Sequence, residues 1–361
     1  MSLTGRSWPR CGLLRASENV LAAEELERIW AMLPEEQVDV LCRSAPMPGI
    51  AVGVVADGGV VLRVASGTAD IRTGQPVMPD TWWDLASLTK MLVTLPEVLD
   101  LVGAGALDLD TSLAEQWGPA RGKPIGQATL RQVLSYDAGM PASDEYFRRG
   151  SGDSVRELVL TTPQERPAGA GAVYSDVAAM VCGFLVADMV GPLDQLAGRR
   201  TGFRFGVPAE QAAATEECPW RGRMIRGEVH DENASALGGV AGHAGAFGTL
   251  DGVLAATSWW MQRMVSDNSV WAESVREQSS NDAGERFGLG WWLTPTRGLG
   301  GRSPGLDGWG CSGFVGNRIW VEPSRGYGVV VLSNRVHPRR SDRGPFNEWV
   351  DDLLDLISRS F

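Results

Sequence analysis

The stretch Ala86-Ser87-Leu88-Thr89-Lys90-Met-Leu-Val-Thr-Leu-Pro-Glu-Val-Leu, residues 86–99, decides how this chain folds. The residues after Lys90 are apolar on nearly every side, which predicts a buried helix. Residues three apart share one helix face, so Ser87 and Lys90 would project together from its first turn. A lysine in such surroundings must find a partner or lose its proton, and an amine beside a hydroxyl can activate a nucleophile. The alternative is structural: Ser87 caps the helix and Lys90 extends toward solvent.

Two further stretches place polar side chains at the ends of predicted elements. Tyr174 and Asp176 lie between a Gly/Pro-rich loop and an apolar helix predicted for 177–189. Both could point into a cleft, or Asp176 could cap the helix while Tyr174 packs. The stretch Gly-Trp-Gly-Cys-Ser-Gly-Phe-Val-Gly at 308–316 runs into a strand predicted for 318–321. Its glycines would let a substrate approach the backbone, where an N–H could stabilise a developing oxyanion.

Patterns typical of β-strands are concentrated near the two ends of the chain. They predict two hairpins, a further strand and two terminal helices. Between them, residues 88–230 alternate helical segments with Gly/Pro-rich loops and have almost no strand pattern. We therefore expect an α+β fold with an antiparallel sheet flanked by helices, built from 16–87 and 231–361, and an inserted, mainly helical domain at 88–230. The predicted terminal elements are hairpins at 50–64 and 318–333, a strand at 289–293, and helices at 20–32, extended by 35–42, and at 346–357.

Composition excludes several classes of function. The 361 residues include 33 basic and 44 acidic ones, and the net charge of −11 should repel nucleic acid and anionic lipid surfaces. No apolar run approaches the roughly 18 residues that a membrane span needs. Five scattered cysteines and three dispersed histidines predict no disulfide framework, metal site or cofactor. We expect no nucleic-acid, membrane or obligate protein partner.

The amino terminus and the cysteines bear on where the protein resides. The first residues lack the apolar core of a secretion signal, and the number of cysteines is odd. These features predict a cytoplasmic protein, or a periplasmic or secreted one if a signal peptide has been removed.

Taken in order, the three polar stretches resemble the serine β-lactamase and penicillin-binding-protein superfamily, in particular its class C-like branch of esterases and D-amino peptidases. Segments 129–139, 227–234 and 237–245 are also similar to family segments, and the resemblance extends from about Met47 to Pro338. It implies an α/β domain and a helical domain with the active site at their interface. It also implies a serine hydrolase that forms an acyl-enzyme.

The resemblance implies a role for each motif residue. Ser87 matches the acylated nucleophile, Lys90 the lysine of the first motif, and Tyr174 the tyrosine of the Y-x-N motif. Cys311-Ser312-Gly313 occupies the place of K-T-G or H-T-G. The backbone N–H groups of Ser87 and Phe314 match the oxyanion hole.

Around these residues we expect substrate contacts from Asp176, Trp309, Cys311, Ser312 and Gly313. Asp176 stands where the family usually has Asn, and a carboxylate near Lys90 favours the ammonium form. This favours Tyr174 over Lys90 as the acceptor of the Ser87 proton. We interpret His230 and His243 as structural.

The expected substrates are small esters or D-amino-acid amides and peptides. One alternative is a true β-lactamase or D-alanyl-D-alanine carboxypeptidase, acting on β-lactams or peptidoglycan-type peptides. Another is a catalytically weak protein that binds cell-wall fragments or penicillin; the retained Ser87, Lys90 and Tyr174 argue against it, and the altered third motif argues for it.

Cys311 generates a prediction about substrate charge. The family's Lys or His can attract a substrate carboxylate, whereas a thiol is neutral near pH 7. Loss of one charge-assisted contact costs about 1.5–3 kcal/mol, or roughly ten- to hundredfold in affinity. We expect hydrolysis of short neutral esters and poor turnover of penicillins in steady-state assays, and Cys311→Lys should shift preference toward carboxylate-bearing substrates. Better turnover of penicillins than of esters by the unmodified protein would contradict this and would require another cation, such as Arg335, in the site.

Overall fold

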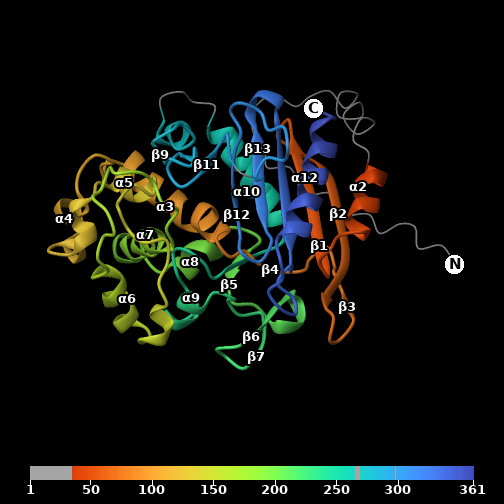
Figure 1. Cartoon of the computed structure of the whole chain (residues 1–361), viewed down its shortest axis with the longest axis horizontal. Coiled ribbons are helices and arrows are strands. Elements are labelled where there is room, and N and C mark those ends of the chain that lie inside the picture. The colour runs from red at the N-terminus through yellow and green to blue at the C-terminus, as the bar shows by residue number, and fades with distance from the viewer. Residues whose placement is uncertain (1–34, 265–268, 297) are drawn as a thin grey trace.

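A nine-stranded antiparallel sheet joins the two ends of the chain in the computed structural model, which describes residues 35–264, 269–296 and 298–361. Its strand order is β3-β2-β1-β14-β13-β12-β11-β10-β9. Figure 1 shows the sheet on one side of the molecule and the inserted helices on the other. The strands are β1 Gly49–Ala56, β2 Gly59–Asp70, β3 Gln75–Pro76, β9 Ser279–Ser280, β10 Arg286–Phe287, β11 Trp292–Leu293, β12 Trp309–Ser312, β13 Arg318–Glu322 and β14 Tyr327–Ser333.

The two predicted hairpins are confirmed, and they lie side by side. β1 pairs with β2 across the Asp57-Gly58 turn, and β13 pairs with β14. β1 also pairs with β14, so the two hairpins form one continuous sheet. The expectation that both chain ends share one antiparallel sheet is therefore correct.

β1 is buried on both faces, which explains its uninterrupted apolar sequence. Ile50, Val52 and Val54 pack with α2 and α12, whereas Ala51 and Val55 belong to the larger core that includes α10. A Cβ atom at Gly53 would lie 2.6 Å from Leu254 of α10, so this glycine allows the helix to lie close to the strand. The final helix, predicted at 346–357, is observed as α12.

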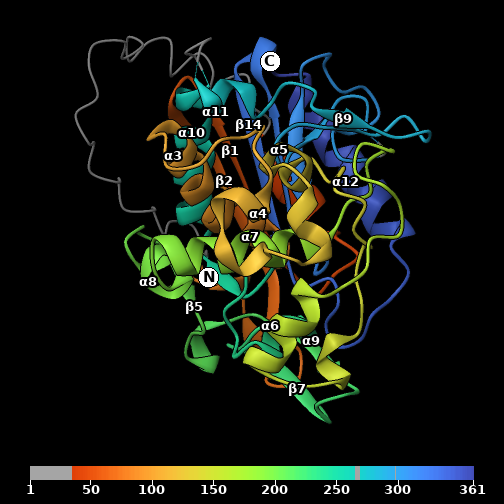
Figure 2. The ribbon, with the colours of Figure 1, turned by 90° about the vertical axis from the view of Figure 1, so that its left-hand side faces the viewer.

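The helices cover the sheet and fill the inserted part of the chain, as Figure 2 shows from the side. Besides α2 Glu35–Arg43, α10 Leu250–Arg263, α11 Val270–Glu273 and α12 Gly344–Ser358, they are α3 Leu95–Gly103, α4 Leu113–Gln116, α5 Leu130–Leu134, α6 Asp153–Leu160, α7 Asp176–Met189, α8 Leu193–Gly198 and α9 Glu232–Ala236. The helix predicted at 20–32 lies outside the described residues. In the part of the chain that is described, no helix combines the length and apolar character needed to cross a membrane.

Short strands inside 88–230 differ from the expectation that this range is almost free of them. β5 Phe203–Phe205 pairs with β8 Ala246–Gly248, which also pairs with β4 Trp83–Asp84. β6 Ala214–Cys218 and β7 Arg223–Arg226 form a separate hairpin. These strands are too short for an alternating pattern to be visible, and β5 pairs with a strand that lies about 40 residues later in the chain. The domain boundaries at 88 and 230 stay a prediction.

The strand predicted at 289–293 is also shorter than expected. Only Trp292 and Leu293 form β11, because Gly290 has a φ of +84° and turns the chain.

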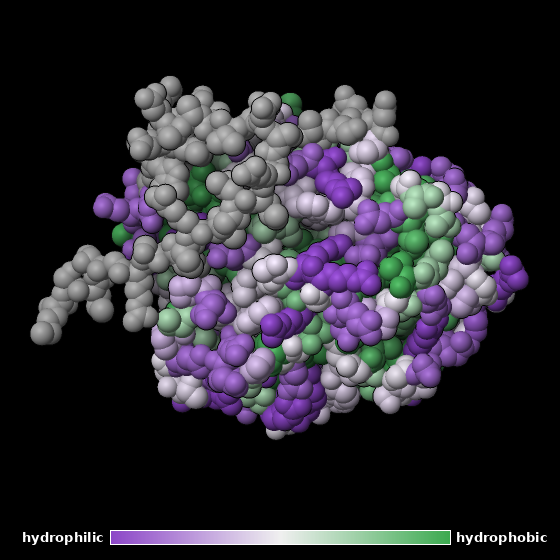
Figure 3. Space-filling view, turned by 180° about the vertical axis from the view of Figure 1, so that it is seen from behind, coloured by the Kyte–Doolittle hydropathy of each residue, from purple (hydrophilic) through white to green (hydrophobic). Residues whose placement is uncertain are grey.

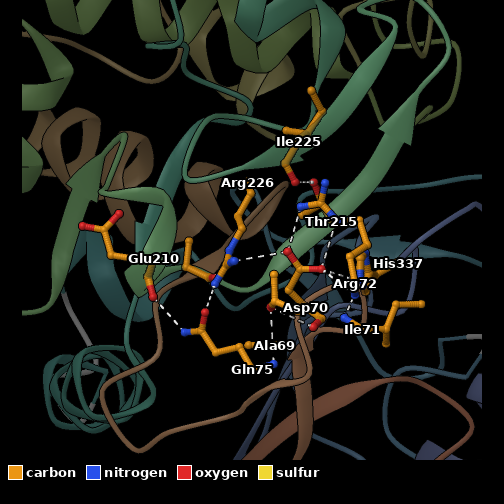
Figure 4. A network of polar contacts seen from close by, with 12 residues as sticks. Ala69, Asp70, Ile71, Arg72, Gln75, Glu210, Thr215, Ile225, Arg226 and His337 are labelled. Atoms are coloured by element: carbon orange, nitrogen blue, oxygen red, sulfur yellow. Dashed lines mark hydrogen bonds and ion pairs between the residues drawn. The ribbon is translucent and has the colours of Figure 1, made fainter.

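A buried carboxylate, Asp70, fixes the β6–β7 hairpin to the end of β2 (Figure 4). Its side chain is 0% exposed and accepts hydrogen bonds from Arg72 at 2.7 and 3.1 Å and from Arg226 at 3.1 Å. Burial alone would raise the pKa of Asp70, but the two guanidinium groups lower it on balance. Nearby, His337 Nε2 accepts the Ile71 N–H at 3.1 Å. A nitrogen that accepts a hydrogen bond carries no proton, so this ring is neutral.

Protonation of His337 should destabilise the fold. Burial lowers its pKa below 6.5, with help from Arg72 and Arg226. The unfolded chain therefore takes up this proton near pH 6.5, whereas the folded protein does so only at lower pH. We expect the free energy of unfolding to fall as the pH drops below about 6.5, with a further loss near pH 4 and below as Asp70 protonates. Urea unfolding midpoints against pH, compared with His337→Gln, measure this.

The Gln side chain can accept the Ile71 N–H without titrating. Equal slopes of stability against pH between about 4.5 and 6.5 in both proteins would contradict the role given to His337.

Candidate active site

Ser87 follows a strained turn at the end of β4. Ala86 has a φ of +46°, a conformation that residues other than glycine rarely adopt. Its N–H donates a hydrogen bond to Asp84 Oδ1 at 2.7 Å, and Leu85 N–H donates to Ala246 O at 2.9 Å. Strain of this kind costs about 1–3 kcal/mol and persists only where the surroundings enforce it. The hydrogen bonds that Asp84 Oδ1 and Ala246 O accept hold the turn in this conformation.

The predicted buried helix follows Ser87 but begins with an irregular turn. Lys90–Thr94 is a π-helical turn that leads into α3. Pro96 has no N–H for the Leu92 carbonyl oxygen four residues earlier, and Arg200 donates to that oxygen instead at 2.6 Å. The Lys90 N–H donates to Ser87 O at 3.1 Å, so the two residues lie in one turn.

The Lys90 ammonium is the centre of the site. Its side chain is 2% exposed, and Nζ donates to Ser87 Oγ at 2.8 Å, to Asp176 Oδ1 at 2.7 Å and to His243 O at 3.3 Å. Burial alone would lower the pKa of Lys90, but the Asp176 carboxylate outweighs this and the pKa is raised. Lys90 is therefore a charged donor at neutral pH, and it does not extend toward solvent.

Asp176 reaches Lys90 because its neighbour caps the helix. Ser175 Oγ accepts the Ala178 N–H at 3.1 Å and is the N-cap of α7. Asp176 is the first residue of α7, where the helix dipole favours a carboxylate. The alternative in which Asp176 itself is the cap is therefore incorrect.

Tyr174 lies beside the lysine with a buried hydroxyl. Lys90 Nζ is 5.0 Å from the centre of its ring, and the ring of Tyr136 packs on it at 4.8 Å. Among the described residues the Tyr174 hydroxyl has no hydrogen-bond partner, although Ser87 and Cys311 lie near enough to influence its pKa. Burial, with Cys311 and Asp176, raises the pKa of Tyr174 well above 10. Tyr174 is thus a phenol at neutral pH.

The third stretch brings β12 against the Ser87 turn. Cys311 is fully buried, its Sγ is 4.0 Å from Ser87 O, and burial raises its pKa to about 11. Gly313 follows the strand, and a Cβ there would lie 2.9 Å from Leu85 O, so only glycine allows this approach. Ser312 is half-buried and Phe314 is 40% exposed.

Trp309 does not line the site. It is 1% exposed and its ring packs on Trp291 at 4.6 Å in the main core. It shares a face of β12 with Cys311, as strand alternation requires, but lies two residues deeper in the sheet.

Both histidines interpreted as structural have carboxylate partners that the sequence did not reveal. His230 Nε2 is 2.5 Å from Glu216 Oε2, and its ring stacks on Phe314 at 5.6 Å. His243 Nε2 is 2.9 Å from Asp231 Oδ1. The signal that could have found them is the family-like character of 227–234 and 237–245. In residues 35–264, 269–296 and 298–361, no three His, Cys, Asp or Glu side chains are grouped as a metal site requires.

Comparisons with known proteins agree on one family. The family model described as Beta-lactamase matches residues 35–349. A relative from Escherichia coli O157:H7, named "Putative D-alanyl-D-alanine carboxypeptidase", is 30% identical over 91% of this chain and 86% of its own length.

Two solved structures share the fold. A class C β-lactamase from Rhodobacter sphaeroides has a TM-score of 0.63 and 18% identity, covering 91% of this chain and 99% of its own. A family VIII carboxylesterase has a TM-score of 0.67 and 18% identity, covering 95% and 99%.

The chain belongs to the β-lactamase family, with the β-lactamase/transpeptidase fold. Like the members of that family, it is a serine hydrolase.

Proposed function

We propose that Ser87 is the nucleophile and that it is acylated by small ester or D-amino-acid amide substrates. The observation that carries this proposal is the 2.8 Å contact from the buried Lys90 ammonium to Ser87 Oγ, beside the unpartnered Tyr174 hydroxyl. Lys90 is charged and buried, and Ser87 Oγ is one of its three acceptors. A buried charge next to a serine oxygen is typical of an active site.

In the proposed reaction, Ser87 Oγ attacks the substrate carbonyl carbon and the carbonyl electron pair moves to its oxygen. Lys90 already donates to Oγ, so the Ser87 proton is free to point elsewhere. Tyr174 is a phenol, so it accepts that proton only while it donates its own to the leaving group. The bond from carbon to the leaving oxygen or nitrogen then breaks. Water attacks the acyl-enzyme by the reverse route and releases the acid.

The oxyanion would be held by backbone N–H groups of Ser87 and Phe314. Among the described residues, neither group donates a hydrogen bond to another part of the protein. An N–H near a reaction centre without a partner in the protein is available to a developing negative charge. Gly313 brings the segment bearing Phe314 close to the Ser87 turn.

A neutral Cys311 supports uncharged esters or amides as substrates, since its raised pKa of about 11 leaves no charge at this position. D-alanyl-D-alanine carboxypeptidase activity is a second candidate, which the name of the relative supports. Arg335 and Arg343 both donate to Phe314 O, at 2.7 and 3.4 Å, and would supply the positive charge that Cys311 lacks.

We also propose a cytoplasmic location. The four cysteines in the described residues, Cys42, Cys182, Cys218 and Cys311, are free and buried, which fits a reducing compartment. Detection of the protein in a periplasmic or secreted fraction would contradict this.

The proposal predicts how three variants behave. Ser87→Ala should abolish labelling by a fluorescent phosphonate and by fluorescent penicillin, and should reduce ester hydrolysis at least about thousandfold. Tyr174→Phe and Lys90→Ala should each slow acylation to a similar extent, roughly 10²- to 10⁴-fold, because Lys90 orients Ser87 Oγ by its hydrogen bond and Tyr174 relays the Ser87 proton. Stopped-flow acylation with a p-nitrophenyl ester measures the rates.

Ser258→Ala, on the distant helix α10, is the matched control and should react normally. An adduct that still forms in Ser87→Ala would show that Ser87 is not the nucleophile. Near-full activity of Tyr174→Phe would show that Tyr174 does not relay the Ser87 proton. Absence of any adduct in the unmodified protein would favour a binding protein.

A further inference from the structure

A buried asparagine, Asn317, connects the two segments that carry the proposed oxyanion donors. It directly precedes β13 and is 1% exposed. Its side-chain Nδ2 donates to Asp84 O at 2.7 Å, three residues before Ser87. Its backbone carbonyl accepts the Gly313 N–H at 2.8 Å, one residue before Phe314. One residue therefore contacts both sides of the proposed oxyanion hole.

The other atoms of Asn317 hold it in place. Oδ1 accepts the Ser333 N–H of β14 at 3.0 Å, so the side chain is bound from both sides and keeps one orientation. β14 lies in the middle of the nine-stranded sheet. Asn317 is therefore anchored to an interior strand of the sheet.

Asp84 extends the connection to the donors themselves. Its Oδ1 accepts the N–H of the strained Ala86, and its Oδ2 accepts the His230 N–H at 2.6 Å. The His230 ring in turn stacks on Phe314. The backbone and the carboxylate of Asp84 thus transmit the position set by Asn317 to the residues next to both donors.

We infer that Asn317 is a positioning residue that sets the separation of the Ser87 and Phe314 N–H groups, through its hydrogen bonds to Asp84 O and Gly313 N. This inference rests on the proposed function, in which those two groups stabilise the oxyanion. Asn317 touches neither substrate nor the reacting atoms. Its effect should appear in the transition state and leave ground-state binding unchanged.

The same sheet contains a matched control. Asn334 is also 1% exposed, and its Oδ1 accepts the Gly49 N–H at 2.7 Å. Its Nδ2 donates to Thr68 O and Ala69 O, both at 3.2 Å. It therefore joins β1 to β2, with no bond to the Ser87 turn or to Gly313.

The test compares Asn317→Ala with Asn334→Ala in the full chain. For each, the acylation rate constant and the substrate dissociation constant are measured by stopped flow with a p-nitrophenyl ester, together with the affinity for phenylboronic acid and the melting temperature. Phenylboronic acid forms a tetrahedral adduct whose boron-bound oxygen would occupy the oxyanion hole. Asn317→Ala should lower the acylation rate constant and the boronate affinity roughly ten- to hundredfold, with substrate dissociation unchanged.

Asn334→Ala should lower the melting temperature without changing acylation or boronate affinity. If Asn317→Ala lowers the melting temperature in the same way and leaves acylation and boronate affinity unchanged, the inference is overturned. A change confined to substrate dissociation overturns it as well.

A second variant covers the case in which Asn317→Ala does not fold. Asn317→Leu is nearly isosteric and fills the same space, but its side chain has no donor for Asp84 O at any pH. The same loss of acylation and boronate affinity is expected at neutral pH, and unchanged values overturn the inference. Failure of the proposed function gives a different result. In that case the Ser87→Ala variant, with Asn317 unchanged, would still hydrolyse the ester.

Discussion

The ammonium group of Lys90 is the constraint on which the rest of the site depends. Removing a charge from water costs several kcal/mol, even after the protein relaxes, and the cost is offset only by a partner and further hydrogen bonds. Lys90 obtains these from Asp176, Ser87 and the carbonyl of His243. The three come from the start of α7, the Ser87 turn and the loop before β8, which must therefore come together wherever the lysine is buried.

The same ion pair determines the roles of the residues in the proposed mechanism. Because Asp176 raises the pKa of Lys90, Lys90 would act on Ser87 as a fixed positive charge and hydrogen-bond donor. Burial keeps Tyr174 protonated too, so neither Lys90 nor Tyr174 is a free base at neutral pH. A proton relay through Tyr174 to the leaving group satisfies both conditions. It also explains how a buried hydroxyl without a partner in the protein has a use once substrate is bound.

The elements with a clear local sequence pattern were predicted correctly. The two hairpins and α12 have long, regular apolar patterns, and the S-x-x-K spacing placed Ser87 beside Lys90 correctly. The short strands β5, β6 and β7 were missed, because strands of three to five residues show no clear alternating pattern, and β5 also pairs with a strand distant in the chain. Trp309 was expected in the pocket from its nearness in sequence to Cys311, but strand geometry places it in the core.

The hydrogen-bond partners of several buried polar side chains could not be predicted from the sequence either. The spacing of His230 and His243 in the sequence does not reveal that they pair with Glu216 and Asp231, and nothing near Asn317 indicates Asp84, more than 200 residues earlier. The His230 contact depends on the β6–β7 hairpin, which carries Glu216 and which the Asp70 cluster holds in place, and the Asn317 contact depends on how β4 lies against the start of β13. The surface does not point to these contacts, since hydrophilic and hydrophobic residues are intermixed over the coloured part of the face seen in Figure 3.

The charge of Lys90 can be measured directly, because the chain has only two lysines. Protein labelled with ¹³C in its lysine side chains should give two Cε signals, and Lys123→Arg identifies the one from Lys90. Titration of that signal by NMR tests the central claim. We predict that the Lys90 signal shows no deprotonation up to about pH 10.5, the ordinary pKa of a lysine side chain. A midpoint near or below pH 7 would show that Lys90 is a neutral amine and would contradict this account.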